Sequence, residues 1–144
     1  MNILLAVDGS EFSDAAIQRL IRTRPADAQV RIIHVIEPFP VIESWVYTPD
    51  WNKMLDEQRK EAEAFVAEAA QTLRNANFPV TTSIESGNAQ AMIIDTATKW
   101  PADLIVMGSH GRRGLERFLM GSVSDGVARH APCSVLIARK RSAA

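Results

Sequence analysis

The sequence predicts a single α/β domain in which a parallel sheet lies between two layers of helices. Short runs rich in Val, Ile and Leu alternate along the chain with segments of helical periodicity. Strands that are separated by helices must run parallel, with right-handed crossovers. The chain has 144 residues, of which 47% are hydrophobic and 23% charged, which is enough for one core. Residues 1–144 are therefore treated as one domain with the order β-α-β-α-β-α-β-α-β.

Five apolar runs are the expected strands. Four of them are nearly continuous in aliphatic residues, which is typical of parallel strands covered by helices on both faces. The third run is shorter and more polar, as expected of a strand at the edge of a sheet. In chain order the runs are Ile3–Val7, Val30–Ile36, Val80–Ile84, Asp103–Met107 and Ser134–Ala138. They predict a sheet of five parallel strands.

The two helices expected in the first half of the chain differ in length. Ser10 or Ser13 can cap the first one, because a serine oxygen accepts a hydrogen bond from the unpaired amides of a first helical turn. Its apolar face repeats at helical spacing through Ala16, Ile17, Leu20 and Ile21. The second helix spans Trp51–Asn75 and is rich in charge. Its inward residues are expected to be Leu55, Ala62, Phe65, Val66, Ala69 and Leu73.

Two shorter helices are expected in the second half. Asn88 caps the third helix, whose sheet-facing residues are expected to be Ala91, Ile94, Ala97 and Thr98. Ser122 begins the fourth, which runs through Arg129 and ends before Pro132. The Phe39–Trp51 segment is a long loop with prolines and aromatic residues. Such loops are often functional, and the alternative is that its aromatic side chains cover apolar surface.

A glycine-rich loop follows the fourth strand. Gly108 stands where that strand ends, Gly111 follows three residues later, and Gly121 precedes the last helix. Residues without a Cβ let the backbone turn sharply and bring N–H groups close to an anion. Ser122 and Ser124 add hydroxyl donors at a helix N-terminus, where the helix dipole favours phosphate. The pattern predicts phosphate binding; the alternative is a loop whose glycines only make turns.

The spacing of this loop separates it from two other phosphate-binding motifs. It lacks the Gly-Lys-Ser/Thr of the P-loop, and it does not follow the first strand as the dinucleotide fingerprint does. It resembles instead the ATP-binding motif of the universal stress protein family. The resemblance covers nearly the whole chain. It extends to the opening Ile3-Leu4-Leu5-Ala6-Val7-Asp8-Gly9-Ser10, to His34-Val35-Ile36 and to the run from Val127 to Ile137.

The resemblance implies a Rossmann-like, three-layer open sheet with the strand order 3-2-1-4-5 and a crevice between strands 1 and 4. It implies ATP as the ligand, with Asp8 facing the phosphates through Mg²⁺ and the backbone of Val35 meeting adenine. A cation is needed because an acidic side chain repels a polyphosphate; capping the entry to the first helix is the other role open to Asp8. The residues placed around the nucleotide are Ala6, Val7, Asp8, Ser10, Val35, Met107, Gly108, Ser109, His110, Gly111, Arg112, Gly121, Ser122, Val123 and Ser124.

Other reactive residues have simpler interpretations. The three histidines are scattered without i, i+4 pairing, so a histidine metal site is not expected. His34 lies in an apolar strand and is interpreted as a core or partner-facing residue. His110 either donates to a phosphate or ribose or is simply exposed. Cys133 is the single cysteine, which excludes an intrachain disulfide, and it is interpreted as a small buried residue.

Charge and hydropathy exclude several partners. The net charge of −1 provides no basic field for nucleic acid or an anionic membrane. No run of residues approaches the roughly 20 apolar positions of a membrane span. One cysteine and the lack of a positively charged leader are typical of a cytoplasmic protein, which is the expected location.

The sequence thus predicts an ATP-binding sensor or regulator of the stress response. A phosphate cradle without an identifiable base, nucleophile or lysine clamp favours binding over turnover, and no catalytic residue is assigned. The alternative is a slow Mg²⁺-dependent ATPase or self-phosphorylating enzyme, with Ser122 or Ser124 as acceptor. The resemblance also implies a homodimer in which the Ser134–Ala138 strands meet across a two-fold axis, and a protein partner that the sequence does not identify.

Overall fold

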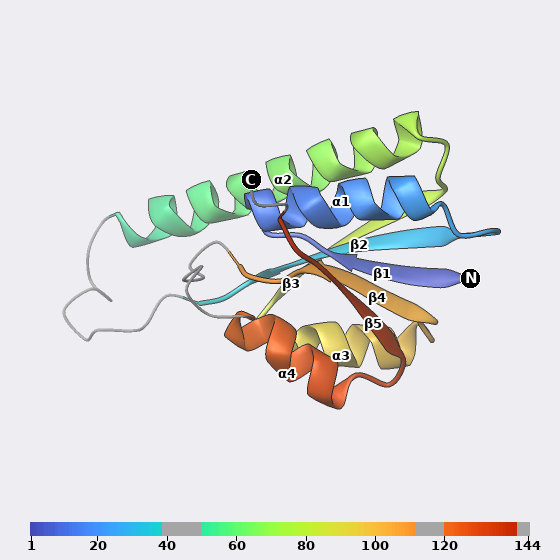
Figure 1. The fold of residues 1–144 in the computed structure, drawn as a ribbon. Coiled ribbons are helices and arrows are strands. Elements are labelled where there is room, and N and C mark those ends of the chain that lie inside the picture. Colours follow the sequence, from blue (N-terminus) through green and yellow to red (C-terminus); the bar gives the residue numbers. More distant parts are fainter. Residues whose placement is uncertain (39–49, 112–119, 141–144) are drawn as a thin grey trace.

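The computed structural model describes residues 1–38, 50–111 and 120–140. All nine expected elements are present within one or two residues of their predicted ends (Figure 1). In chain order they are β1 Asn2–Ala6, α1 Glu11–Thr23, β2 Gln29–Ile36, α2 Trp51–Asn75, β3 Val80–Ser86, α3 Ala89–Lys99, β4 Leu104–Gly108, α4 Ser122–His130 and β5 Ser134–Ala138. The predicted α/β class is confirmed. The predicted loop before α2 falls largely on residues 39–49, which lie outside the described residues.

The five strands form one parallel sheet in the order β3-β2-β1-β4-β5, which confirms the predicted topology. β1 is central and pairs with both β2 and β4, so that Ile3 has Val30 on one side and Leu104 on the other. β3, the most polar strand, lies at one edge as expected, and β5 lies at the other. The connections leave β1 in opposite directions, so a crevice opens at the carboxyl ends of β1 and β4.

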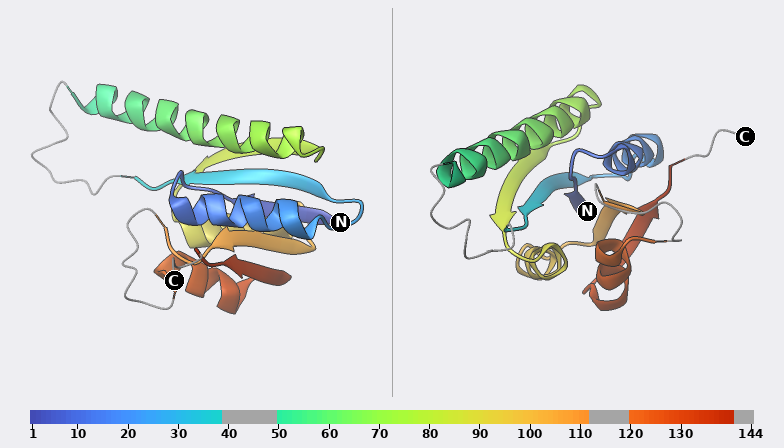
Figure 2. Two further views of the ribbon diagram at one scale, coloured as in Figure 1. Left: turned by 45° about the horizontal axis from the view of Figure 1, so that its top comes forward. Right: turned by 90° about the vertical axis from the view of Figure 1, so that its left-hand side faces the viewer.

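Two helices cover each face of the sheet. α1 and α2 lie on one face, and α3 and α4 lie on the other, as the end-on view of Figure 2 shows. The core under α1 and α2 includes Leu5, Leu20 and Leu73, whereas the core under α3 and α4 includes Leu4 and Ile93. Successive residues of a strand point to opposite faces of its sheet. The apolar run of β1 therefore supplies both cores at once.

Capping side chains mark where α1 and α3 begin, whereas α4 begins without one. The hydroxyl of Ser10 caps α1 by accepting a hydrogen bond from the amide of Ser13 at 3.2 Å, so Ser10 and not Ser13 is the cap. Asn88 caps α3, as predicted, through a 2.9 Å bond from the amide of Ala91. The N-cap of α4 is Gly121, which has no side chain with which to cap the helix. The first turn of α4 therefore differs from those of α1 and α3.

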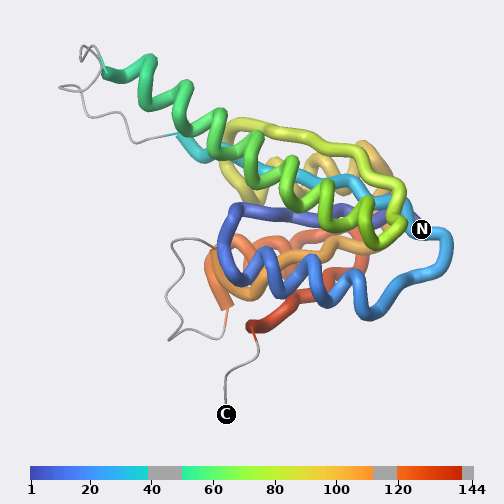
Figure 3. The backbone as a smooth tube through the Cα atoms, turned by 90° about the horizontal axis from the view of Figure 1, so that it is seen from above, coloured from blue at the N-terminus to red at the C-terminus, as the bar shows by residue number. Residues whose placement is uncertain are grey.

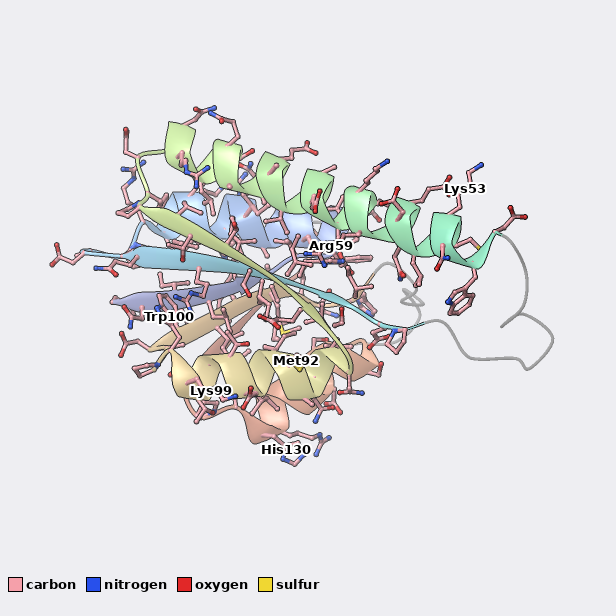
Figure 4. The ribbon with its side chains drawn as sticks, turned by 180° about the vertical axis from the view of Figure 1, so that it is seen from behind. Lys53, Arg59, Met92, Lys99, Trp100 and His130 are labelled. Carbon is pink, nitrogen blue, oxygen red and sulfur yellow. The ribbon has the colours of Figure 1, made fainter. Side chains whose placement is uncertain are left out.

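The expected inner face of α2 is wrong at its beginning. Leu55 is 41% exposed, and the buried residues of α2 begin only at Ala62. The first turns of the helix extend past the ends of the strands, as seen from above in Figure 3 and at the labelled Lys53 in Figure 4. A side chain there has no sheet to pack against. None of the described helices, α2 included, is both long and apolar enough to cross a membrane.

The expected inner face of α3 is also wrong in part. The helix meets the sheet through Ile93 and Ala97, while Ala91 and Thr98 are exposed. Consecutive apolar residues in the middle of this helix allow two faces that differ by about 100° of rotation. Periodicity alone does not choose between these two faces.

Gly108 serves packing rather than a turn. It is the last residue of β4 and pairs with Ala138 of β5. A Cβ at this position would lie 2.7 Å from the backbone carbon and oxygen of Phe12 in α1. The absence of a side chain at Gly108 therefore lets the first turn of α1 lie directly against the end of β4. The sharp turn that the sequence suggested at this residue is not its structural reason.

Replacing Gly108 with alanine should destabilise the fold by about 1–3 kcal/mol, because the new methyl group overlaps rigid backbone atoms. Urea unfolding followed by circular dichroism measures this change. Gly111→Ala is the matched control, since among the described residues its Cβ would meet an Asp8 carboxylate oxygen at 3.1 Å and no backbone atom, and this overlap is smaller. Equal free energies of unfolding for the two variants would contradict this packing role.

Candidate functional site

A small, mostly apolar hollow lies where β1 and β4 end. Its volume is about 100 Å³, and its walls come from the strand ends of β1, β2 and β4 and from the first turns of α3 and α4. We call it the slot. Of the residues predicted to surround a nucleotide, those that line the slot are Ala6, Val7, Asp8, Val35, Met107, Gly108, His110, Gly111, Val123 and Ser124. The topology thus brings together residues from both ends of the chain.

A larger hollow of about 600 Å³ adjoins the slot. We call it the outer cavity. The two share Asp8, Val35, Gly111 and Val123, and the outer cavity adds the predicted residues Gly121 and Ser122. Its far wall is the overhanging first half of α2. Together the two hollows reach the size range of small-molecule sites, about 300–1,000 Å³.

The described wall of the outer cavity is acidic. Its charged side chains are those of Asp8, Glu37, Glu57 and Glu61, which come from the end of β1, the end of β2 and α2. Four carboxylates around one hollow repel an anion. A polyphosphate in this cavity would therefore need a cation beside it.

The backbone of Val35 points into the crevice. The Val7 amide donates to the Ile33 carbonyl at 3.0 Å on the β1 side, whereas the Ile36 carbonyl accepts from Gly87 at 3.0 Å on the β3 side. Backbone groups in a parallel strand alternate between its two neighbours. Val35 therefore directs its N–H and C=O to the β1 side, at a level where β1 has already ended (Figure 1).

A short clasp joins the beginning of α4 to the end of β4. The carbonyl of Ser109 accepts hydrogen bonds from the Gly121 amide at 2.7 Å and from the Ser124 hydroxyl at 2.7 Å. A Cβ on Gly121 would lie 3.2 Å from the Cα of His110, so the two segments touch closely. The clasp aims the N-terminal end of α4 at the outer cavity.

Two predicted ligand residues hold the clasp instead of facing solvent. Ser109 and Ser124 are each 2% exposed, and the Ser124 hydroxyl donates to backbone oxygen. His110 is 8% exposed, which rules out the interpretation that it is simply exposed. Its Nδ1 lies 2.9 Å from the Ser109 hydroxyl, and its ring lies 5.1 Å from the ring of Phe12. The buried hydroxyls therefore act on the protein itself.

Asp8 supports the N-cap of α1, but Ser10 is the cap itself. Asp8 Oδ1 accepts hydrogen bonds from the Ser10 amide at 3.0 Å and from the Ser13 hydroxyl at 2.7 Å. The same hydroxyl accepts from the Asp8 amide at 2.9 Å. Asp8 Oδ2 is turned across the crevice, because a Cβ built on Gly111 would lie 3.1 Å from it. One oxygen therefore fixes the side chain, and the other faces the loop.

Some predicted residues lie elsewhere, and some site residues were not predicted. Ser10 caps α1 and Ser109 carries the clasp, and neither lines the slot or the outer cavity. Arg112 lies outside the described residues. The slot also includes His34, whose Nδ1 donates to the Val7 carbonyl at 2.7 Å, and Ile93 of α3. Ile93 has a sequence signal in its i, i+4 spacing with Ala97, whereas nothing in the sequence singles out His34 as a wall residue.

The described residues offer a metal ion only a sparse donor set. Among residues 1–38, 50–111 and 120–140, no three or more His, Cys, Asp or Glu side chains come together as a metal site. A divalent ion at Asp8 would depend on other ligands, such as phosphate oxygens and water. Mg²⁺ is commonly held this way, with one or two carboxylates and several waters.

A third hollow lies between α1 and α2, on the face of the sheet that these two helices cover. Its volume is about 470 Å³, and Asp14 and Glu68 face it from the two helices. Burial raises the pKa of the Asp14 carboxyl above its ordinary value, and the carboxylates of Glu68, Asp8 and Glu11 raise it further. Phe65 borders both this hollow and the outer cavity. We call the third hollow the α1–α2 groove.

Comparison with known proteins supports this arrangement. A family model described as the universal stress protein family matches residues 1–139. A putative universal stress protein of Staphylococcus epidermidis is 35% identical over 141 residues, which cover 96% of this chain and 83% of the relative.

Two solved structures share the fold. The universal stress protein UspA from Lactobacillus plantarum superposes with a TM-score of 0.80 at 27% identity, covering 96% of this chain and 97% of the other. A universal stress protein crystallised in complex with cAMP superposes with a TM-score of 0.71 at 25% identity, covering 95% of each chain. The fold and topology derived from the sequence are thus those of solved relatives.

Asp14→Asn should raise stability at neutral pH. Because the folded pKa of Asp14 lies above its unfolded value, its ionised form is disfavoured by folding. This cost is present above the folded pKa and disappears as the pH falls below the unfolded pKa. Urea midpoints of variant and wild type should therefore differ at neutral pH and converge in acid.

Asp56→Asn on α2 removes the same charge from an exposed i, i+4 pair with Lys60 and serves as the control. It should not raise the urea midpoint at neutral pH. A loss of stability in Asp14→Asn at neutral pH would contradict the direction of the Asp14 shift.

Proposed function

This chain belongs to the universal stress protein family, and from that premise we propose that it is a cytoplasmic, nucleotide-dependent regulator of the stress response that binds ATP. The observation that carries the proposal is the N-terminus of α4, which lacks a capping side chain and borders the outer cavity. The relative crystallised with cAMP supports an adenine nucleotide as the ligand class.

The slot suits the base of the nucleotide. Its walls include the apolar side chains of Ile33, Ile93, Met107 and Val123, which can enclose a flat ring. At its edge Val35 directs a backbone donor and a backbone acceptor to the same side. Adenine carries a ring acceptor beside an amino donor, and this pair complements Val35, whereas guanine presents the opposite pair at the same edge. We therefore place adenine in the slot.

The beginning of α4 suits the phosphates. Unpaired amides and the positive end of the helix dipole favour anions at a helix N-terminus. The corresponding positions of α1 and α3 already accept bonds through Ser10 and Asn88. At α4 the N-cap has no side chain, and Ser122 and Val123 border the outer cavity. This contrast supports α4 as the phosphate-binding helix.

The residues present fit Mg²⁺ bound together with the phosphates. Asp8 turns Oδ2 toward the crevice, and the acidic wall disfavours a polyphosphate that carries no cation. Asp8 would hold the ion, which would supply the positive charge that neutralises the phosphates. The Ser10 amide and the Ser13 hydroxyl both donate hydrogen bonds to Asp8 Oδ1, so the carboxylate is held in place before any ligand binds.

Binding is favoured over turnover because a hydroxyl and an imidazole at the site already donate hydrogen bonds to backbone carbonyls. The Ser124 hydroxyl donates to the Ser109 carbonyl, and His34 Nδ1 donates to the Val7 carbonyl. The Ser124 proton is therefore committed to a backbone oxygen, and His34 keeps only Nε2 as a proton acceptor. Ser122 is exposed and remains the acceptor of the alternative, a slow Mg²⁺-dependent ATPase or self-phosphorylating enzyme.

Protein purified without added ligand should release ATP on denaturation, and Gly121→Val should not. The valine would push the start of α4 away from Ser109 and His110, since even a Cβ lies within 3.4 Å of both. Chromatography of the released nucleotide gives the stoichiometry.

The control is Ala128→Val, which adds similar bulk to an exposed position of the same helix. It should retain the wild-type nucleotide content. Equal nucleotide in Gly121→Val and wild type would overturn the role assigned to the start of α4.

Single-turnover assays with Mg²⁺ and labelled ATP should show the nucleotide held intact over many minutes. The described walls of the slot and the outer cavity hold no lysine or arginine that would stabilise the charge of a phosphoryl-transfer transition state, so release of phosphate should remain slow. Release at several turnovers per minute, or label transferred to the protein, would favour the enzymatic alternative.

We also propose that the protein is a homodimer joined along β5. This strand is the sheet edge next to β4, and Val135, Leu136 and Ile137 are only partly buried in it. An apolar edge strand offers unpaired backbone groups to a second chain. A two-fold pairing of identical strands closes such an edge.

Val135→Lys should convert the dimer to a monomer in sedimentation experiments, because a charge would then lie in the interface. Nucleotide content should change little, since Val135 does not line the slot or the outer cavity. Ser134→Lys places the same charge at the exposed start of the strand and is the control. A wild-type protein that stays monomeric at all concentrations would disprove the dimer.

A further inference from the structure

The ring of Phe65 lies directly on the turn that follows β1. Gly9 has a φ of +78°, and a Cβ built on it would overlap the ring carbons of Phe65. The same ring lies 5.9 Å from the ring of His34, edge to face. Phe65 comes from the middle of α2, so a distant helix rests on the backbone beside Asp8. Only glycine accommodates both the positive φ and this contact.

The two residues next to Asp8, Val7 and Gly9, are thus held by residues of β2 and α2. His34 donates to the Val7 carbonyl on one side of Asp8, and Phe65 covers Gly9 on the other. From α1, Ser13 bonds both the amide and Oδ1 of Asp8. The hydrogen bonds fix the side chain relative to α1, but they do not fix the turn relative to α2 and β2. Phe65 and His34 supply that second restraint.

Resting on the nucleotide site proposed above, we propose that Phe65 is a positioning residue that holds the Asp8–Gly9 turn so that the Asp8 carboxylate faces Gly111 and the bound cation. The ring separates the outer cavity from the α1–α2 groove and lines both. Shortening it would open the two hollows to each other and leave room for the turn to move. Asp8 would then lose its fixed direction, while the slot would change less, because Phe65 does not line it and its walls from β4, α3 and α4 do not belong to this turn.

The chain offers a matched control beside Phe65. Val66 is 4% exposed and packs in the core under α1 and α2, but, unlike Phe65, it lines neither the outer cavity nor the α1–α2 groove. Val66→Ala therefore removes apolar bulk from the same helix without releasing the turn. Phe65→Leu keeps apolar bulk over Gly9 and serves as the conservative rescue of Phe65→Ala.

Two measurements on these variants test the proposal. Amide hydrogen exchange of the ligand-free protein reports the Asp8 and Ser10 amides, which are bonded in this turn. Exchange there should speed up in Phe65→Ala, and should stay near wild type in Val66→Ala and Phe65→Leu. Calorimetric titration then compares adenosine, ATP with chelator and ATP with Mg²⁺. In Phe65→Ala the gain in ATP affinity from Mg²⁺ should fall by about tenfold, as for other residues that orient a metal ligand, while adenosine affinity should fall much less.

The outcomes separate this inference from the proposed function. If Phe65→Ala and Val66→Ala give the same exchange and the same Mg²⁺ gain, the positioning role is overturned while ATP binding stands. If no variant binds adenosine or ATP but exchange at Ser10 rises in Phe65→Ala alone, the positioning of Asp8 stands and the nucleotide site fails. Equal losses of adenosine and Mg²⁺-ATP affinity in Phe65→Ala would show a general structural effect and would also overturn the inference.

Discussion

The carbonyl oxygen of Ser109 is the acceptor on which the candidate site depends. It binds the Gly121 amide and the Ser124 hydroxyl, each at 2.7 Å, and so joins the start of α4 to the residue after β4. The amide of Ser109 in turn donates to the Ala138 carbonyl at the end of β5. One residue therefore ties α4 to two strands. This junction acts together with the packing of α4 on α3 and β5, in which Val127 is fully buried, to aim the first turn of α4 at the crevice.

This junction divides the polar residues of the site into two groups. Buried hydroxyls such as that of Ser124 satisfy backbone groups and hold the walls together. Other polar groups face the hollows: the first residues of α4 border the outer cavity, and the N–H and C=O of Val35 point to the β1 side. Asp8 belongs to both groups, because one carboxylate oxygen bonds Ser10, the N-cap of α1, and the other faces Gly111. The buried hydroxyls are thus committed to the protein, and the backbone of Val35 and the carboxylate of Asp8 are left to meet a ligand.

The sequence was sufficient for the fold because its strongest signals are local and periodic. Aliphatic runs, serine and asparagine caps and the glycine spacing located all nine elements, and family resemblance supplied the strand order. It was not sufficient for roles that depend on distant contacts. Gly108 is small because Phe12 of α1 touches it, and Phe65 matters through Gly9, fifty-six positions earlier in the chain. The prediction of the inner face of α3 was partly wrong for a different reason, because its adjacent apolar residues fit two rotations of the helix equally well. The side chains that pack against a residue decide its role and the buried face of its helix, and a single sequence does not identify those side chains.

The central claim is that phosphates bind at the backbone of α4, and backbone amide resonances test it most directly. In ¹⁵N-labelled protein, adding ATP with Mg²⁺ should produce the largest shift at the amide of Ser122, and adenosine should shift Val35 and Val123, which line the slot, while leaving Ser122 nearly unchanged. That pattern would place the phosphates at the helix N-terminus and the base at the slot. Shifts of equal size with adenosine and with ATP at Ser122, or phosphate-dependent shifts confined to other parts of the chain, would contradict the account.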